Sequence, residues 1–167
     1  MFTIRRIFDD ILPANRTALD QVLALLRSRF PLLRPETVEA VPVALRNPLK
    51  YRFQSILYVA EGPQQKVLGF ALLAHEPVLH FGYLDYLVSD TLLTGRGVGG
   101  ALYQRVREEA ALLDMIGLFF ECLPTVVVQE GGYDNRSIGS NAAHFFSGLA
   151  AGIGTSSQVL QNNRHVK

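Results

Sequence analysis

Residues 83–117 read YLDYLVSDTLLTGRGVGGALYQRVREEAALLDMIG, and this stretch decides the fold. Residues 83–89 are rich in apolar and β-favouring types and contain neither glycine nor proline, which predicts a strand. Further along, apolar residues recur at helical spacing, with charged residues off that stripe. The stripe of the predicted helix consists of Val98, Leu102, Val106, Ala110 and Leu113. We expect Gly117 to end this helix.

Glycines gather where the strand gives way to the helix, at positions 95, 97, 99 and 100. The first N–H groups of a helix have no partner within the helix, and the helix dipole is positive at that end. Because glycine has no Cβ, an anion can approach these amides closely. The junction therefore predicts a seat for a phosphate or pyrophosphate, to which Arg96 would add a charged contact.

The same segment resembles the acyl-CoA-binding signature of the GNAT N-acetyltransferase superfamily, Gln/Arg-x-x-Gly-x-Gly/Ala, which follows the fourth strand of that fold. Here residues 94–99 read TGRGVG, so both framing glycines are present. Thr94 stands where the family usually has Gln or Arg, which puts one phosphate contact in doubt. An ordinary strand–turn–helix corner is the alternative interpretation, because a GxG triplet alone is common.

The order of the predicted elements supports the resemblance. The N-terminal three-quarters of a GNAT domain has the order strand, helix, helix, three strands, helix and strand. The resemblance thus covers residues 1–122 and implies an α/β (α+β) fold with a central mixed, mostly antiparallel sheet flanked by helices. Besides the strand and helix above, we expect strands at 1–8, 54–61, 66–75 and 118–122, with helices at 14–30 and 35–46.

The C-terminal part, residues 123–167, departs from the GNAT pattern. It predicts a strand at 125–129, a turn at Gly131-Gly132 and a helix at 138–149. Residues 123–155 resemble the C-terminal part of zinc-dependent deacetylases of the histone deacetylase and acetylpolyamine amidohydrolase type, where the tyrosine matching Tyr133 polarises the substrate carbonyl. That family needs zinc ligands and histidines upstream, but residues 1–122 offer only His75 and His80. We therefore expect no metal site and no deacetylase activity.

Composition narrows the class of protein. With 167 residues, 49% hydrophobic and 19% charged, the chain predicts a globular domain. A formal charge of +1 argues against nucleic acid as a partner, and no apolar run approaches the roughly 20 residues of a membrane-spanning helix. Cys122 is the single cysteine, which excludes an intrachain disulfide. We expect a cytoplasmic protein.

The GNAT resemblance implies acetyl-CoA as co-substrate. Its diphosphate would lie on the glycine turn, its pantetheine arm would run beside the strand that precedes the turn, and the Val88 amide would donate to the thioester oxygen. The implied cofactor-binding residues are Leu87, Val88, Ser89, Thr94, Gly95, Arg96, Gly97, Val98, Gly99 and Gly100.

Three residues are candidates for catalysis. Asp85 alternates with Tyr83 and Leu87 along the strand and is the candidate base, although a surface carboxylate is an equally simple interpretation. Glu121 on the strand at 118–122 is the second candidate. Tyr133 is the candidate acid that protonates the leaving thiolate.

Three hypotheses for function remain open. The first is an N-acetyltransferase that moves an acetyl group from acetyl-CoA to a primary amine of a small molecule or peptide, by direct attack in a ternary complex. The second is a catalytically impaired acyl-CoA-binding module, and the third is a fragment of a fused acetyltransferase–deacetylase protein. If the strand at 125–129 does not cover the strand at 118–122, the exposed edge predicts a homo-oligomer.

Overall fold

One six-stranded sheet organises the part of the chain that the computed structural model describes, residues 1–90, 97–122 and 126–130. The strands follow one another in sequence order across the sheet. Every neighbouring pair is antiparallel except β4 and β5, which are parallel. The strands are β1 (Thr3–Ile7), β2 (Gln54–Glu61), β3 (Val67–Glu76), β4 (Phe81–Ser89), β5 (Gly117–Cys122) and β6 (Val126–Glu130). The predicted mixed, mostly antiparallel sheet is confirmed.

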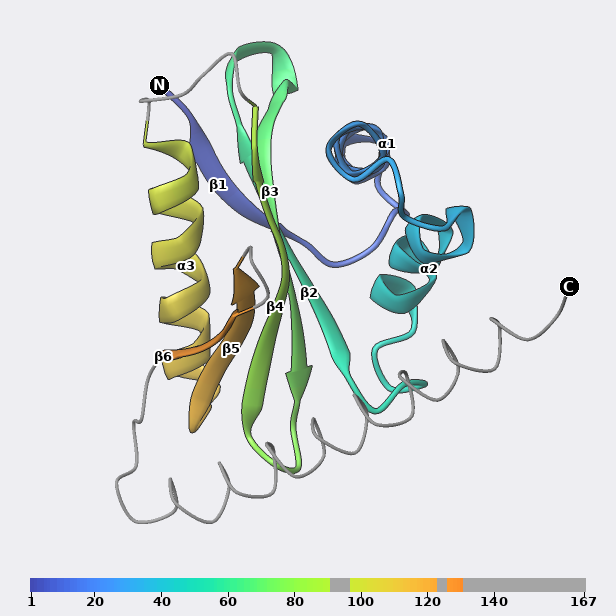
Figure 1. Cartoon of the computed structure of the whole chain (residues 1–167). Helices are drawn as coiled ribbons and strands as arrows, with labels where there is room; N and C mark the ends of the chain where they lie inside the picture. Colours follow the sequence, from blue (N-terminus) through green and yellow to red (C-terminus); the bar gives the residue numbers. More distant parts are fainter. Residues whose placement is uncertain (91–96, 123–125, 131–167) are drawn as a thin grey trace, which may run out of the picture. The chain divides into compact units, whose positions relative to one another are not determined.

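Helices cover both faces of this sheet (Figure 1). Helices α1 (Pro13–Arg29) and α2 (Pro35–Arg46) lie on one face, and α3 (Val98–Leu112) lies on the other. A short 3₁₀ turn, η1 (Pro63–Gln65), joins β2 to β3. Pro42 lies inside α2, which continues to Arg46. Among the described residues, no helix is long and apolar enough to cross a membrane.

Each face of the sheet has its own hydrophobic core. Under α1 and α2, helical residues such as Leu19, Val22 and Leu26 pack with Phe70 and Val88 from the strands. Under α3, every predicted stripe residue from Val98 to Ala110 is buried against strand residues that include Ile56, Leu73 and Leu84. Because successive strand residues point to opposite faces, β2 and β3 supply both cores and are almost continuously apolar.

The end of α3 differs from the sequence prediction, because the helix stops at Leu112 and Gly117 is the first residue of β5. Asp114 has φ 49°, a left-handed conformation that Asp tolerates better than most residues. The amide of Met115 donates to the Ala110 carbonyl and that of Asp114 to the Ala111 carbonyl. This pair of bonds is a Schellman cap, with Asp114 in the place usually taken by glycine.

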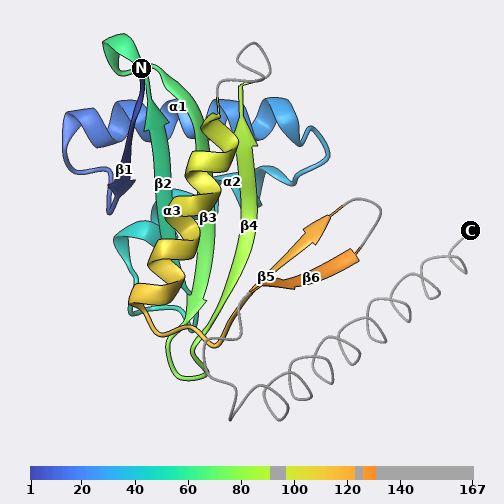
Figure 2. The ribbon, with the colours of Figure 1, turned by 90° about the vertical axis from the view of Figure 1, so that its left-hand side faces the viewer.

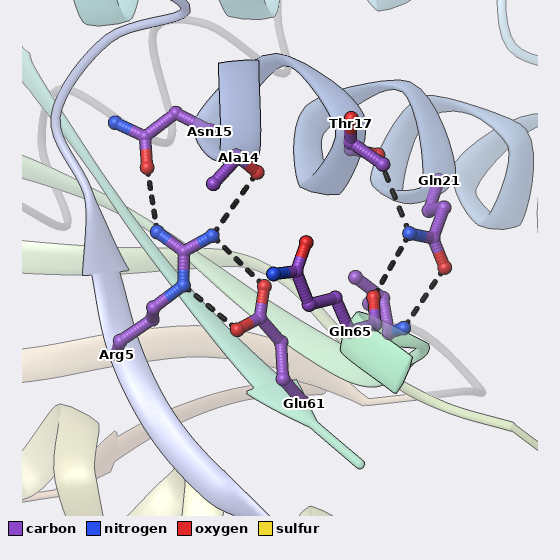
Figure 3. Close-up of polar contacts among 8 residues, drawn as sticks. Arg5, Ala14, Asn15, Thr17, Gln21, Glu61 and Gln65 are labelled. Atoms are coloured by element: carbon purple, nitrogen blue, oxygen red, sulfur yellow. Dashed lines mark hydrogen bonds and ion pairs between the residues drawn. The ribbon is translucent and has the colours of Figure 1, made fainter. Parts of the chain in front are cut away.

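Polar contacts attach α1 to the strands β1, β2 and β3 (Figure 3). Arg5 donates to both carboxylate oxygens of Glu61, at 2.8 and 2.9 Å, and to the Asn15 side chain in the first turn of α1. Gln21 donates to the Gln65 carbonyl and accepts from the Val67 amide. These bonds fix α1 over the end of the sheet where β2 turns into β3.

The strand predicted at 125–129 is present as β6, and it pairs antiparallel with β5 from Leu118↔Glu130 to Cys122↔Val126. The turn at 131–132, Tyr133 and the helix expected at 138–149 lie outside the described residues. The deacetylase-like character of residues 123–155 and the boundary at residue 122 therefore stay predictions.

Candidate functional site

The strand β4 has a paired half and an open half. Toward β3 it is paired from Phe81 to Ser89, but toward β5 it is paired only from Phe81↔Gly117 to Tyr83↔Phe119. Figure 2 shows the two strands diverging beyond that point. Among the described strands, none pairs with residues 84–89 on this side. Backbone groups along that edge are thus placed to bind an extended ligand as an added strand.

A β-bulge lies where the open half begins. Leu84 pairs with Leu73, but the next pair is Tyr86 with Leu72, so Asp85 is the extra residue on β4. An extra residue reverses the alternation of side chains after it. Leu84 belongs to the core under α3, whereas Tyr86 and Val88 pack under α1 and α2.

The bulge overturns one expectation from the sequence. Tyr83 pairs with Ala74, a strand neighbour of Leu73, and so lies on the face of α1 and α2. Leu87 pairs with Ala71 of the α3 core, so it lies on the opposite face. The prediction that Tyr83, Asp85 and Leu87 share one face is therefore wrong, because it assumed an unbroken two-residue period.

The electrostatic environment of Asp85 is unusual for a carboxylate. Its side chain is exposed to water, yet protein atoms surround it closely enough that partial desolvation raises its pKa to about 6. The ring of Tyr86, the next residue, packs edge-on against Phe30 with centroids 5.1 Å apart. Burial and the Asp85 charge together raise the pKa of the Tyr86 hydroxyl. A carboxyl that titrates near neutral pH suits a general base.

Bare backbone marks the first turn of α3. Gly97 is the N-cap with φ 74°, a conformation that favours glycine, and no side chain among the described residues caps the helix. A Cβ on Gly99 would come no closer than 4.0 Å to Ser89 Oγ, and one on Gly100 would meet nothing within 4 Å. Glycine within a helix costs up to about 1 kcal/mol relative to alanine. Because packing requires neither Gly99 nor Gly100, the open surface they leave is the feature that needs a functional explanation.

Gly69 holds the two parts of the site together. A Cβ on Gly69 would lie 2.5 Å from the Val88 carbonyl oxygen and 3.1 Å from the Val98 side chain. Only a residue without a side chain lets β3 approach the end of β4 and the start of α3 so closely. The open half of β4 therefore ends directly beside the glycine-rich helix start. Sequence reasoning missed Gly69, although a glycine inside the apolar run VLGFALL was a signal of close backbone approach.

Charged groups from distant segments meet at Asp90, just beyond β4. Its carboxylate lies 3.8 Å from Nη2 of Arg29, at the end of α1, and 4.0 Å from Nζ of Lys66, before β3. The Asp90 amide donates to the Leu68 carbonyl. Two cations therefore lie near the end of β4 that adjoins the glycine-rich helix start, and no local sequence pattern pointed to them.

The predicted site residues divide into three groups. Two sets of predicted residues meet around one corner. They are Leu87, Val88 and Ser89 at the end of β4, and Gly97, Val98, Gly99 and Gly100 at the start of α3. Glu121 lies on β5, opposite Val127 of β6, on the strand that diverges from β4. Thr94, Gly95, Arg96 and Tyr133 lie outside the described residues.

Comparisons with solved structures identify the fold. The chain is similar to Tetrahymena GCN5, with a TM-score of 0.62 and 14% identity over 73% of this chain and 71% of that one. A putative GNAT acetyltransferase from Desulfovibrio desulfuricans matches with a TM-score of 0.54 and 20% identity, over 73% of each chain. An aminoglycoside 6'-N-acetyltransferase complexed with coenzyme A matches with a TM-score of 0.56 and 20% identity, over 71% of this chain and 60% of that one.

These likenesses show that the chain has the fold of the GNAT acetyltransferases, which confirms the predicted fold class. No family model matches the sequence, and no curated protein matches it either.

Proposed function

We propose that this protein is an N-acetyltransferase that uses acetyl-CoA and acetylates a primary amine. The observation that carries the proposal is the corner at which the open half of β4 ends beside the bare first turn of α3. An open strand edge suits the amide-containing arm of coenzyme A, and a helix start without side chains suits its diphosphate. The similar aminoglycoside 6'-N-acetyltransferase is complexed with coenzyme A, which supports the same cofactor here.

The residues fit this co-substrate chemically. Gly97, Gly99 and Gly100 place no side chain over the amides of the first helical turn, and that turn contains no acidic residue to repel an anion. Thr94, Gly95 and Arg96 would complete the phosphate seat, and the backbone of Leu87, Val88 and Ser89 would hold the pantetheine arm. When bound, acetyl-CoA supplies an acetyl group activated as a thioester.

The chain's own groups would then act on the acceptor amine. Asp85 takes the proton from the ammonium group, so that the neutral nitrogen attacks the thioester carbonyl carbon. The Val88 carbonyl oxygen lies beside Gly69 and the Asp90 amide donates to Leu68, so the Val88 amide faces β3 and the expectation that it binds the thioester oxygen is wrong. The amides of Leu87 and Ser89 face the open edge, and one of them would donate a hydrogen bond to the carbonyl oxygen as it gains negative charge. A C–N bond forms, the C–S bond breaks, and the thiolate that leaves takes up a proton. Glu121 is the second candidate for the base and Tyr133 is the candidate for the acid.

Calorimetric titration with coenzyme A tests the cofactor seat. We expect the Gly99→Ala, Gly100→Ala double variant to bind at least about tenfold more weakly, because two methyl groups would cover the amides. Its thermal stability should be unchanged or higher, since alanine is the better helix former. Gln104→Ala, on an exposed position of the same helix, is the matched control and should alter neither property. Equal binding by the double variant would contradict the proposed seat.

A thiol-release assay with a panel of primary amines then tests catalysis. Turnover supports the acetyltransferase. Binding of acetyl-CoA without turnover for any amine would favour the catalytically impaired acyl-CoA-binding module. Absence of binding by the unaltered chain would contradict both.

A further inference from the structure

Residues 8–12, between β1 and α1, form an exposed segment that is both apolar and acidic, with the sequence FDDIL. The large apolar side chains of this segment are each more than half exposed, and they are Phe8, Ile11 and Leu12. Asp9 has no ion-pair partner among the described residues, although one of its oxygens accepts a hydrogen bond from the Ile11 amide. We call residues 8–12 the acidic patch.

Residues 49–53, between α2 and β2, form a second exposed segment that is apolar and basic, with the sequence LKYRF. Its exposed apolar and aromatic side chains are Leu49, Tyr51 and Phe53. No carboxylate within the described ranges pairs with the Lys50 ammonium, which lies 5.5 Å from the Tyr51 ring. Residues 78–79, in the β3–β4 turn, add two more exposed apolar side chains. We call residues 49–53 and 78–79 the basic patch.

Ion pairs place the two patches next to each other. At their boundary, Arg46 Nε at the end of α2 lies 3.2 Å from Asp10 of the acidic patch. Arg52 of the basic patch lies 3.1 Å from Glu76 at the end of β3, and Glu76 also accepts a hydrogen bond from the Leu79 amide. The connection before β2 and the β3–β4 turn therefore lie together at one end of the sheet (Figure 2). The acidic patch adjoins the basic patch where α2 ends.

We infer that two copies of the chain associate through this surface, with the acidic patch of each copy against the basic patch of the other. Apolar side chains gathered on one exposed surface are typical of an interaction site. A twofold dimer presents the same surface on both subunits, so the contact forms twice. The apolar groups of one patch would leave water against those of the other, which favours association. Asp9 would pair with Lys50 of the second copy.

The arrangement of charges favours a second copy over a partner of uniform charge. An anionic membrane or an acidic peptide would attract Lys50 but repel Asp9, and a cationic partner would do the reverse. A second copy carries both signs beside apolar groups and meets them in the opposite order. The surface is therefore complementary to itself in charge as well as in apolar character.

The dimer contact leaves the candidate site free. The β3–β4 turn of the basic patch precedes Phe81, whereas the glycine-rich helix start lies beside Ser89, at the other end of β4. Neither patch includes a residue of β5, β6 or α3. We therefore expect variants in the patches to keep the affinity for coenzyme A, so association and cofactor binding can be tested separately.

Sedimentation velocity over a range of protein concentrations tests the inference. We expect the unaltered full chain to form a dimer, and Asp9→Lys and Lys50→Glu should each raise its dissociation constant at least about tenfold. The effect is large because a like-charged pair then occurs twice in each dimer. An equimolar mixture of the two variants should dimerise about as tightly as the unaltered chain, since opposite charges again face each other at both contacts.

Variants outside the patches control for unspecific effects. Asp20→Lys reverses an exposed charge on α1 and should leave the dimer unchanged. Leu49→Ser should weaken the dimer several-fold, because Leu49 is 90% exposed in the basic patch. Leu112→Ser, at an exposed position at the end of α3, should not weaken it.

Three outcomes would overturn the inference. The first is a monomer at every concentration, and a lower melting temperature of both charge-reversal variants in that monomer would assign the surface to residues of the same chain. The second is a dimer that neither charge reversal weakens, which would use another surface. The third is loss of the dimer in both variants without recovery in their mixture, which would show that the two charges act within one chain.

Discussion

At the scale of single residues, Asp85 shows how one extra residue changes the chemistry of a strand. As the bulged residue of β4 it lies where the pairing with β3 changes register and where β5 has already diverged. Bulges are frequent beside active sites because they redirect side chains. The raised pKa of Asp85 and its place at the start of the open edge make it the better placed of the two candidate bases.

The pH dependence of catalysis tests this role. The base must be ionised, so we expect kcat/KM to rise with pH through about 6, the pKa that desolvation gives Asp85 in the folded protein. Asp85→Asn should lower kcat by about 10²-fold or more and remove this limb of the profile. Glu121→Gln should keep the limb. A limb near pH 6 that persists in Asp85→Asn, with loss of activity in Glu121→Gln, would assign the base to Glu121.

A second residue-scale prediction concerns His75, which is 5% exposed on β3. Neither of its ring nitrogens has a hydrogen-bond partner among the described residues. Burial, with the nearby His80, lowers the pKa of His75 below its usual value. In the unfolded chain the ring takes up a proton near pH 6.5, but in the folded chain it resists doing so. Stability should therefore fall as the pH drops below about 6.5.

His75→Leu should remove that loss. We expect its melting temperature at pH 5.5 to exceed that of the unaltered protein, by an amount equivalent to about 1 kcal/mol, with a smaller difference at pH 8. Thermal unfolding at both pH values measures this. His80→Asn, which suits the positive φ of that position, removes only the smaller contribution of the neighbouring charge and should lessen the loss in part. A variant that is less stable than the original protein at both pH values would show that His75 contributes by packing instead.

At the scale of elements, a buried carboxylate joins α3 to the N-terminal strands. Glu109 is 5% exposed and accepts from Arg6 at 2.7 Å and from the Tyr58 hydroxyl at 2.5 Å. Burial and the hydrogen bond to Glu109 raise the pKa of Tyr58 to about 12, so the hydroxyl stays protonated as a donor. The helix whose first turn forms the candidate phosphate seat is thus held to β1 and β2 near its far end.

Replacing Glu109 should be costly. Glu109→Leu leaves the Tyr58 hydroxyl and the Arg6 guanidinium without their acceptor, so we expect the free energy of unfolding to fall by about 2–3 kcal/mol. Tyr58→Phe, which removes one bond and leaves the carboxylate paired with Arg6, should cost about 1 kcal/mol. Urea denaturation measures both, and Glu108→Leu on the exposed side of α3 is the control. Equal stability of the Glu109 and Glu108 variants would contradict this account.

At the scale of the whole molecule, the edge of the sheet next to the candidate site is covered by β6. The five residues of β6 pair with Leu118–Cys122, which is all of β5 except Gly117. An uncovered β5 would offer unpaired backbone groups to a second chain. The pairing therefore removes the reason for which a homo-oligomer was expected, while the oligomeric state itself stays a prediction.

Proline substitution in β6 tests how much this pairing matters. In an antiparallel pair, adjacent residues of a strand direct their amides to opposite sides, so one of Val127 and Val128 donates to β5. The double variant Val127→Pro, Val128→Pro therefore removes one hydrogen-bond donor from the β5–β6 pairing. We expect a lower melting temperature and concentration-dependent self-association by sedimentation velocity. Val127→Ala, Val128→Ala keeps both amides and should remain closer to the original protein. Unchanged sedimentation of the proline variant would show that β6 does not protect the edge.

The sequence by itself determined the elements and their order. Apolar residues at helical and strand spacing located all three helices and all six strands among the described residues to within about two residues, except at the end of α3. The glycines before α3 indicated an anion seat, because their effect on the backbone is local. Only the tertiary structure decided how β4 and β5 diverge, where the bulge lies, and that Arg29 and Lys66 meet at Asp90. Those features depend on strand pairing and on contacts between residues far apart in the chain, which local periodicity does not encode.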